Sequence, residues 1–178
     1  KEVPEAVINV VTHDMFHQMS LTSSPYAKGV ATNIKSGFTK LASDTVKPFR
    51  VAESPVQLEC KVLEVKELGT TGGAGNLIIC EVTKMHINEN VLNEHGVIDQ
   101  HKIDLVARMG GNWYCRAHGD SLFEIEKPIT TMGVGVDSIP AAIRNSDVLT
   151  GNNLGQLGNL EIMPTIEEIA AYKQSLNT

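Results

Sequence analysis

The sequence predicts a mainly β fold with peripheral helices, whose strands form a small β-barrel. Two apolar-rich segments, 56–66 and 76–87, are joined by a glycine-rich turn at 69–75, and this pattern predicts a long β-hairpin. A third segment, 107–117, contains a Gly-Gly pair followed closely by Trp and Tyr. Glycine inside a strand is typical of a bend, so the three segments together indicate a curved sheet.

The first strand of this hairpin changes its apolar face midway. Apolar and polar residues alternate at first, which places polar side chains such as Glu59 on the opposite face. Leu63 and Val65 then reverse the pattern, which predicts a bulge near Val62-Leu63. The second strand, 76–87, is apolar on both faces in its first half, as is typical of a central or barrel strand.

The N-terminal part predicts one strand and two short helices. Segment 6–11 is almost wholly apolar, which predicts a buried strand that must be paired or covered. We therefore expect the chain to begin inside a larger domain. Thr12 or Asp14 can cap a helix that ends near Leu21, and 30–36 predicts a second short helix.

The rest of the chain predicts short elements and a change of character at Pro128. A helical run near 99–105 and a strand at 121–125 precede this proline. We therefore expect a partial barrel domain over 1–127 and an extension with short helices over 128–178, which packs on the barrel or on a partner.

The extension carries three local signals. Ser138 is predicted to cap a short helix that has Pro140 in its first turn. Glycines at 151–158 predict an irregular segment. Thr165 and Glu168 form a capping box, which predicts the start of a final helix.

Composition and charge argue against several classes of function. The formal net charge is −6 and the isoelectric point is near 5.5, which disfavours a nucleic-acid partner because phosphate binding needs clustered Lys and Arg. No apolar run is long enough to span a bilayer and no signal-peptide pattern is visible, so we expect no membrane partner. Cys60, Cys80 and Cys115 are an odd number without a Cys-x-x-Cys pair, which predicts free, buried thiols in a reducing cytoplasm and no metal site.

Three familiar catalytic motifs are missing. The glycine loop at 72–75 lacks the Lys-Ser/Thr of a P-loop and the spacing of a dinucleotide fingerprint, so we interpret it as a hairpin turn. His13 and His17 are four residues apart, but the Glu of the zinc-protease motif is missing between them. No Gly-x-Ser-x-Gly occurs, so covalent hydrolase chemistry is not expected.

Two groups of polar residues are candidates for binding an anion. Lys47 and Arg50 are the best of them, because Arg suits planar bidentate contacts; the alternative is a solvated pair or an ion pair with Glu53. The hydroxyls of Ser20 and Ser23 could also bind a phosphate, although hydroxyls after a helix are more often turn formers.

The Gly-Gly strand offers a candidate surface for a flat ring. Gly110 and Gly111 would allow close approach of the backbone, but the same pair could mark a barrel bend. Trp113 and Tyr114 could stack on a ring, and core or interface packing is the alternative for Trp113.

Several stretches carry a resemblance to a known family. They are Ala6–Val11 followed by His13–Leu21, Lys47–Val51 followed by Ser54–Val56, Leu77–Val82, Arg108–Tyr114, and the residues from Pro128 onward. With them the chain resembles the flavin reductase-like, FMN-binding split-barrel family, in the branch of flavoredoxin-like proteins and of reductase components of two-component monooxygenases. The N-terminal strands of that family are absent from this sequence.

The resemblance implies a split β-barrel with a helical C-terminal extension that binds FMN. It implies hydride transfer from NAD(P)H to the isoalloxazine ring in a homodimer with flavin at the subunit interface. The alternatives are a non-catalytic, FMN-binding electron-transfer protein and an inactive truncated fragment. No catalytic acid or base is expected, because the flavin carries the chemistry.

The resemblance also implies which residues lie near the flavin. Asn9 in the first strand and Gln18 in the first helix match recurring family positions, and a strand Asn that caps a neighbouring turn is the alternative for Asn9. The full expected cofactor-binding set is Asn9, Gln18, Ser20, Ser23, Lys47, Arg50, Gly110 and Gly111.

Overall fold

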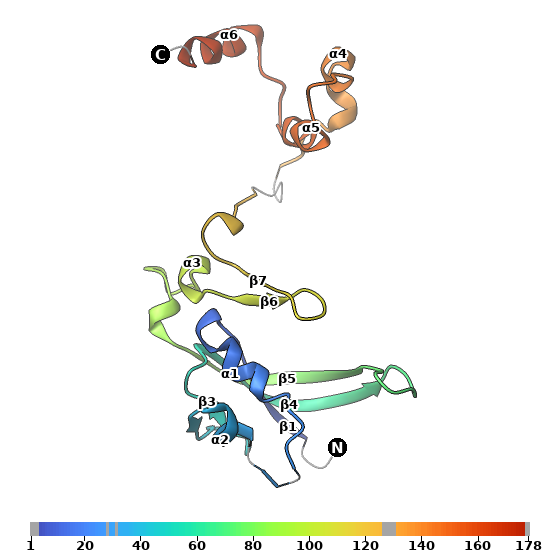
Figure 1. Ribbon diagram of the computed structural model, residues 1–178. Helices are drawn as coiled ribbons and strands as arrows, with labels where there is room; N and C mark the ends of the chain where they lie inside the picture. Colours follow the sequence, from blue (N-terminus) through green and yellow to red (C-terminus); the bar gives the residue numbers. More distant parts are fainter. Residues whose placement is uncertain (1–3, 28, 31, 126–130, 177–178) are drawn as a thin grey trace. The chain divides into compact units, whose positions relative to one another are not determined.

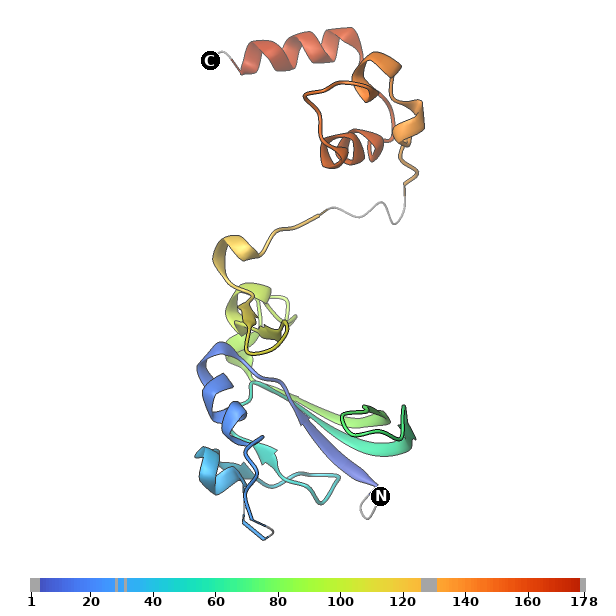
Figure 2. The same cartoon turned by 45° about the vertical axis from the view of Figure 1, so that its right-hand side comes forward.

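The computed structural model describes residues 4–27, 29–30, 32–125 and 131–176 (Figures 1 and 2). The chain divides into two compact units, residues 1–123 and 124–178. The first unit contains, in chain order, β1 (Glu5–Asn9), the 3₁₀ helix η1 (His13–Met15), α1 (Phe16–Leu21), α2 (Thr32–Ser36), β2 (Lys40–Leu41), β3 (Arg50–Val51), β4 (Val56–Glu67), β5 (Asn76–Ile87), η2 (Glu89–Val91), α3 (Gln100–Ile103), β6 (Val106–Arg108), β7 (Tyr114–Arg116) and η3 (Gly119–Ser121).

The main sheet is antiparallel and has the strand order β1-β4-β5. Strands β4 and β5 pair along their whole lengths, which confirms the predicted hairpin (Figure 1). The ladder is irregular between Val62 and Glu64, which confirms the predicted bulge. A second irregularity, between Glu59 and Cys60, was not expected from the sequence. The second irregularity begins at Glu59, a residue of the site described below.

The predicted single strand over 107–117 is wrong, because the Gly-Gly pair reverses the chain. The structure has two short antiparallel strands there, β6 and β7. The Gly110 carbonyl accepts a hydrogen bond from the Trp113 amide at 3.0 Å. Gly111 has a φ of 55°, in the left-handed region that favours glycine. The glycine pair therefore forms a tight turn between two strands.

The apolar core of the first unit lies where β4 meets the loops before α3. Its buried members Val56, Val91 and Ile103 are packed against partly buried Val10, Leu58, Ile98 and Leu105. The Asp99 carboxylate accepts hydrogen bonds from the amides of His101 and Lys102, so it caps α3. This packing fixes the end of β4 that carries the polar residues of the site.

The second unit is helical. It contains η4 (Val136–Ser138), α4 (Ala141–Arg144), α5 (Gly151–Gly158) and α6 (Ile166–Ser175). The amide of Glu168 donates to the Thr165 hydroxyl at 3.2 Å, and the Thr165 amide donates to the Glu168 carboxylate at 2.8 Å. The predicted capping box and the helix after it are therefore confirmed.

Three sequence expectations near or within this unit are wrong. The expected strand at 121–125 is not formed, and Gly119–Ser121 is a 3₁₀ helix instead. Ser138 does not cap α4, because Pro140 occupies the N-cap position. Residues 151–158, expected to be irregular, form α5, because the side chains of Thr150 and Asn153 cap its first turn reciprocally. Capping outweighs the low helix propensity of its glycines.

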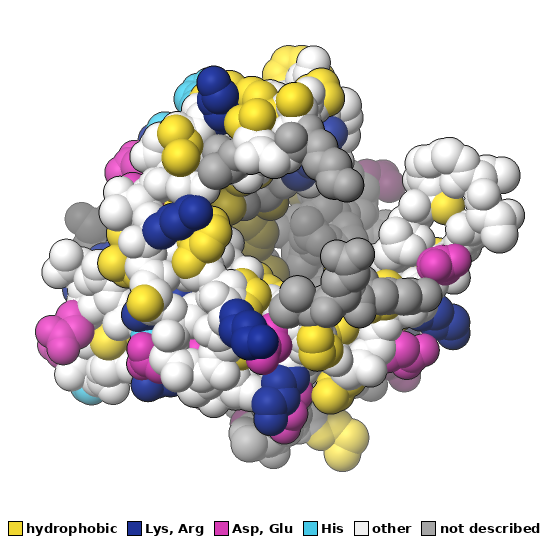
Figure 3. Space-filling model, turned by 90° about the horizontal axis from the view of Figure 1, so that it is seen from below, with side chains coloured by type: hydrophobic (Ala, Val, Ile, Leu, Met, Phe, Trp, Pro, Cys, Tyr) yellow, Lys and Arg dark blue, Asp and Glu magenta, His cyan; other side chains and the backbone are white. Residues whose placement is uncertain are grey.

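Large apolar side chains remain exposed along β5. Neighbouring residues Ile78 and Ile79 are 55% and 42% exposed, so both faces of this half of the strand are open to solvent. Figure 3 shows apolar side chains lying between charged ones on one face of the molecule. Within the described residues, no helix combines the length and hydropathy needed to cross a membrane.

Candidate functional site

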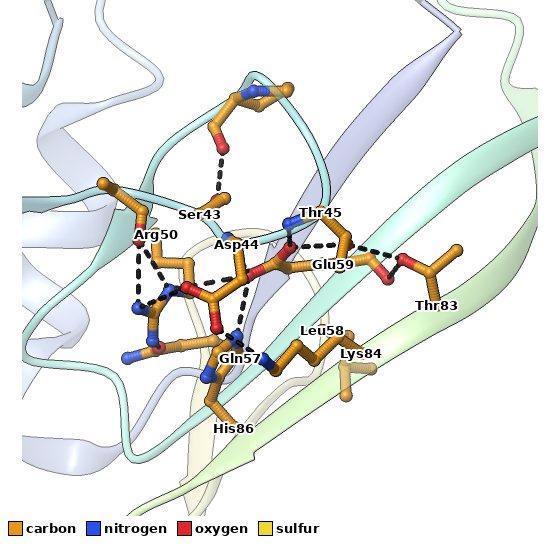
Figure 4. Close-up of polar contacts among 12 residues, drawn as sticks. Ser43, Asp44, Thr45, Arg50, Gln57, Leu58, Glu59, Thr83, Lys84 and His86 are labelled. Carbon is orange, nitrogen blue, oxygen red and sulfur yellow. Dashed lines mark hydrogen bonds and ion pairs between the residues drawn. The ribbon is translucent and has the colours of Figure 1, made fainter.

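A buried carboxylate organises the polar side of the main sheet (Figure 4). Glu59 of β4 is fully buried. Its Oε1 accepts a hydrogen bond from the Asp44 amide at 2.9 Å and lies 2.7 Å from Nε2 of His86. Its Oε2 accepts hydrogen bonds from both the amide and the hydroxyl of Thr45, each at 2.6 Å. Both oxygens of the buried charge are therefore satisfied by protein groups.

These partners determine the protonation state of Glu59. Burial by itself raises the pKa of the carboxyl group, since it disfavours the charged form. The hydrogen bonds from Thr45, from the Asp44 amide and from His86 outweigh burial and hold the pKa far below its usual value. Glu59 is thus a carboxylate at neutral pH.

Arg50 of β3 lies beside this carboxylate. Its Nε and Nη2 donate to the Ala42 carbonyl at 3.1 and 3.0 Å, and its Nη1 donates to Oε1 of Gln57 at 2.9 Å. Its Nε is also 3.8 Å from Oε1 of Glu59. Its Nη2 lies 3.9 Å from Oδ1 of Asp44. A guanidinium has five N–H donors, so within the described residues the three hydrogen bonds leave one N–H on each of Nη1 and Nη2 without a hydrogen bond, the one on Nη2 being on the nitrogen that pairs with Asp44. Glu53, the ion-pair partner considered for Arg50, accepts a hydrogen bond from the Thr39 amide.

A cavity of about 330 Å³ opens next to Arg50, and we refer to it as the Arg50 pocket. Gln57 is fixed on its floor, because its Nε2 donates to the carbonyls of Val51 and Ser54, each at 2.8 Å. The lining comes from β2, from β3 and the turn after it, from the start of β4, and from the end of β5 and the residue after it. Its residues are Leu41, Arg50, Ala52, Ser54, Pro55, Gln57, His86, Ile87 and Asn88.

A second cavity, of about 350 Å³, lies beside α1, and we refer to it as the Gln18 pocket. The Nε2 of Gln18 donates to the Ser36 carbonyl at 3.1 Å, which ties α1 to α2. Asp104 lines the same cavity and forms a bidentate pair with Arg116, at 2.7 and 2.6 Å. The hydrogen bonds from Arg116 lower the pKa of Asp104, which stays ionised.

The other expected site residues outside the Gly-Gly pair lie on β1, on the loop between β2 and β3, and at the end of α1. Asn9 accepts a hydrogen bond from the Val51 amide at 2.9 Å through its Oδ1, so it holds β1 to β3 beside Arg50. Lys47 is exposed on the loop between β2 and β3, and its amide donates to Glu5 at 2.8 Å. Ser20 and Ser23 are exposed, at the end of α1 and just after it.

The Gly-Gly pair belongs to a different sheet from Asn9 and Arg50. Gly110 and Gly111 form the turn of the β6–β7 ribbon, which does not pair with the main sheet in the described residues. A Cβ atom at either position would meet nothing within 4 Å. The structure thus brings Asn9, Lys47 and Arg50 onto neighbouring segments, and places the other expected residues on separate ones.

Three ligand-type side chains in the site could suggest a metal centre. One ligand atom each from Asp44, Glu59 and His86 lies within 4.8 Å of the others. However, both oxygens of Glu59 already accept hydrogen bonds, and Asp44 pairs with Lys84. The geometry therefore favours a hydrogen-bonded network over a metal site.

Sequence reasoning missed three residues that hold this site together. Gln57 and Glu59 were placed on the polar face of β4, and His86 was one of several scattered histidines without an evident carboxylate partner. The register aligns Gln57 with His86, so Glu59 is the diagonal neighbour of that histidine. The available signal was the polar residue at every second position of β4, at Gln57 and Glu59, next to a loop. The same pattern is typical of a strand with one face in solvent, so it did not indicate burial.

Comparison with known proteins decides the family. The sequence profile of the flavin reductase like domain matches residues 1–105, which is more than half of the chain. The chain belongs to this family. The predicted resemblance and the predicted split-barrel fold class are thereby confirmed.

Three solved structures are similar to this flavin reductase-like chain. Component B of nitrilotriacetate monooxygenase from Bacillus cereus has a TM-score of 0.63 at 21% identity, over 70% of this chain and 61% of that one. A Shewanella frigidimarina protein, assigned as a flavin reductase with a split-barrel domain, has a TM-score of 0.59 at 25% identity, with the same coverage. Flavoredoxin of Desulfovibrio vulgaris has a TM-score of 0.57 at 18% identity, over 72% of this chain and 65% of that one.

The match covers only part of each curated relative. The chain spans 61% of the length of the curated relatives that it matches. The activity, substrates and partners of the whole protein are therefore matters for proposal.

Proposed function

We propose that this chain is part of an FMN-dependent oxidoreductase that reduces flavin with NAD(P)H. The observation that supports this most strongly is the family match over residues 1–105. The similar structures include a protein assigned as a flavin reductase. The proposed reaction is hydride transfer from the nicotinamide to the isoalloxazine ring, a chemistry that the flavin supplies when it is bound.

The donor set of the Arg50 pocket fits the anionic end of FMN. A phosphate needs charged or strongly polar N–H donors, and Arg50 has two N–H groups that make no hydrogen bond within the described residues, although its Nη2 lies 3.9 Å from the Asp44 carboxylate. His86 and Asn88 line the same pocket, and Lys47 lies on the preceding loop. We propose that Arg50 and Lys47 bind the phosphate and that Asn9 keeps Arg50 in place by holding β3.

The remaining expected residues complete the proposed binding set. Gln18 lines its own pocket, and Ser20 and Ser23 at the end of α1 present hydroxyls to solvent. Gly110 and Gly111 offer an unobstructed backbone turn. We propose that these residues contact the ribityl chain or the ring, and that the flavin-binding part ends near residue 127, with 128–178 as an extension.

A titration tests flavin binding directly. FMN added to the protein should lose fluorescence and show a shifted visible absorbance band. Unchanged fluorescence and absorbance at saturating protein would refute flavin binding by this chain.

A non-catalytic electron-transfer role is the second candidate, because flavoredoxin of Desulfovibrio vulgaris shares the fold. NADH and NADPH oxidation, each measured with and without FMN, separates the two candidates. Flavin-dependent oxidation of either nucleotide supports the reductase. Flavin binding without nucleotide oxidation supports the electron-transfer protein.

We further propose that the protein is a cytoplasmic homodimer. The exposed apolar residues of β5 need a cover, and a second copy would provide one. The cytoplasmic location is proposed because Cys60, Cys80 and Cys115 form no disulfide in the described residues. Only Cys60 is buried; the prediction that all three thiols are buried is wrong for Cys115, which is exposed. The molar mass in solution, measured by light scattering, tests the dimer.

A further inference from the structure

Glu59 is connected to the proposed phosphate-binding arginine through the loop between β2 and β3. Its carboxylate accepts the amide hydrogens of Asp44 and Thr45, which fixes that part of the loop. Two residues earlier, the Ala42 carbonyl accepts two hydrogen bonds from the Arg50 guanidinium. Glu59 therefore holds the loop at residues 44–45, and the loop in turn holds Arg50 through the Ala42 carbonyl.

The same carboxylate also contacts two residues that line the Arg50 pocket. His86 on β5 lies 2.7 Å from Oε1 of Glu59, and Nε of Arg50 lies 3.8 Å from the same oxygen. Figure 4 shows Glu59 between the loop residues and the strand β5. One buried group thus contacts both of the basic side chains that line the pocket.

We propose that Glu59 is a positioning residue for the flavin phosphate: it fixes the loop at 42–45 and His86, so that the Arg50 guanidinium keeps its two remaining N–H donors directed into the pocket. This inference rests on the proposed function. Preorganisation of this kind strengthens binding because the ligand does not have to order the loop itself.

Glu59→Gln is the informative substitution. The amide side chain has nearly the same shape, but its NH₂ group cannot accept a hydrogen bond from the Asp44 or Thr45 amide. One anchor of the loop is lost, and Arg50 becomes mobile. We expect the dissociation constant of FMN to rise about tenfold, while that of riboflavin, which has no phosphate, stays within about twofold.

The comparison of FMN with riboflavin separates positioning from a general structural role. Loss of fold would weaken both ligands, whereas positioning of Arg50 weakens only the one with a phosphate. In an Arg50→Ala background, Glu59→Gln should have no further effect on FMN, because the group that Glu59 positions is gone. Glu64→Gln, an exposed change on the same strand, is the matched control and should bind both flavins as the wild type does.

Each outcome has a defined meaning. Equal weakening of FMN and riboflavin, unchanged FMN binding, or additivity with Arg50→Ala would overturn the role of Glu59 and leave the proposed function standing. Wild-type protein that binds neither flavin would overturn both. If Glu59→Gln does not fold, as judged by circular dichroism, Thr45→Val removes one of the four hydrogen bonds to the carboxylate. That variant should then show a smaller loss for FMN only, and an equal loss for both flavins would overturn the proposal.

Discussion

The Nε2 atom of His86 lies 2.7 Å from Oε1 of Glu59, and the two side chains share one face of the β4–β5 hairpin. They are diagonal neighbours, since the register pairs His86 with Gln57. This contact places a fully buried carboxylate next to the candidate site. Its charge state and its loop contacts lead to the first prediction.

Thr45→Val should make the protein less dependent on pH in the acid range. Burial raises the pKa of Glu59, but the hydrogen bonds from Thr45 and its other partners outweigh it and lower the pKa below the usual 4.5. A lowered pKa means that the carboxylate stabilises the fold above pH 4.5 and loses this contribution as the pH falls. Wild-type melting temperature should therefore drop steeply between about pH 5 and pH 2.

In Thr45→Val the lost hydroxyl raises the pKa of Glu59 toward its usual value. The melting temperature at pH 7 should be a few degrees lower, and its fall with acid should be shallower. Thermal melts at several pH values measure both. A variant curve parallel to the wild-type curve would show that this hydroxyl does not control the titration.

Arg50→Lys should weaken FMN binding about tenfold, although the charge is kept. Lysine cannot reproduce the fork that contacts the Ala42 carbonyl and Gln57 while leaving donors for a phosphate. Fluorescence titration gives the dissociation constant. Arg144→Lys is the control, because Arg144 also donates to a backbone carbonyl but lies in the second unit. Wild-type affinity in Arg50→Lys would mean that only the charge at this position matters.

Gly133→Ala should destabilise the second unit by about 1–3 kcal/mol. A Cβ atom at position 133 would clash with the Gly158 carbonyl oxygen, where the backbone cannot give way cheaply. Gly151→Ala is the matched control, because a Cβ atom there meets nothing within 4 Å. Hydrogen exchange of the α5 amides compares the two variants, and equal protection in both would contradict the steric argument.

Thr165→Ala should fray the start of α6 at a cost of about 1 kcal/mol. The substitution removes the hydroxyl that accepts the hydrogen bond from the Glu168 amide. Thr165→Ser keeps that hydroxyl and should restore protection of the first-turn amides in hydrogen exchange. Rapid exchange in both variants would show that the capping box does not hold the helix end.

Ile79→Lys should convert the proposed dimer into a monomer. Ile79 is one of the exposed apolar residues of β5, and a buried lysine without a partner would oppose association. Light scattering measures the molar mass over a range of protein concentrations. Val97→Lys changes an exposed apolar residue in a loop outside the strand and should leave the mass unchanged. A monomeric wild type would remove the basis of this prediction.

The sequence was sufficient for the elements whose signals are local. Period-two alternation located β4, and a run of residues apolar on both faces located β5. The reversal of the apolar face located the bulge between Val62 and Glu64. The capping box at Thr165 located the start of α6 in the same way. In each case neighbouring residues along the chain carry the whole physical signal.

Local signals were misleading where two of them competed. Strand propensity around 107–117 concealed the turn at Gly110-Gly111, because apolar residues on both sides of a tight turn look like one strand. Glycines at 151–158 suggested an irregular segment, but side-chain capping at Thr150 was the stronger effect.

The sequence by itself determined the family, the hairpin and the choice of Arg50 as a candidate anion-binding residue. Only the tertiary structure decided that Glu59 is buried, because its polar partners come from a loop 14 and 15 residues away and from a strand 27 residues away. A carboxylate on a strand is normally exposed, since burying it costs free energy unless donors surround it. Those donors meet only when the chain folds, and this is why the group that organises the site was invisible in the sequence.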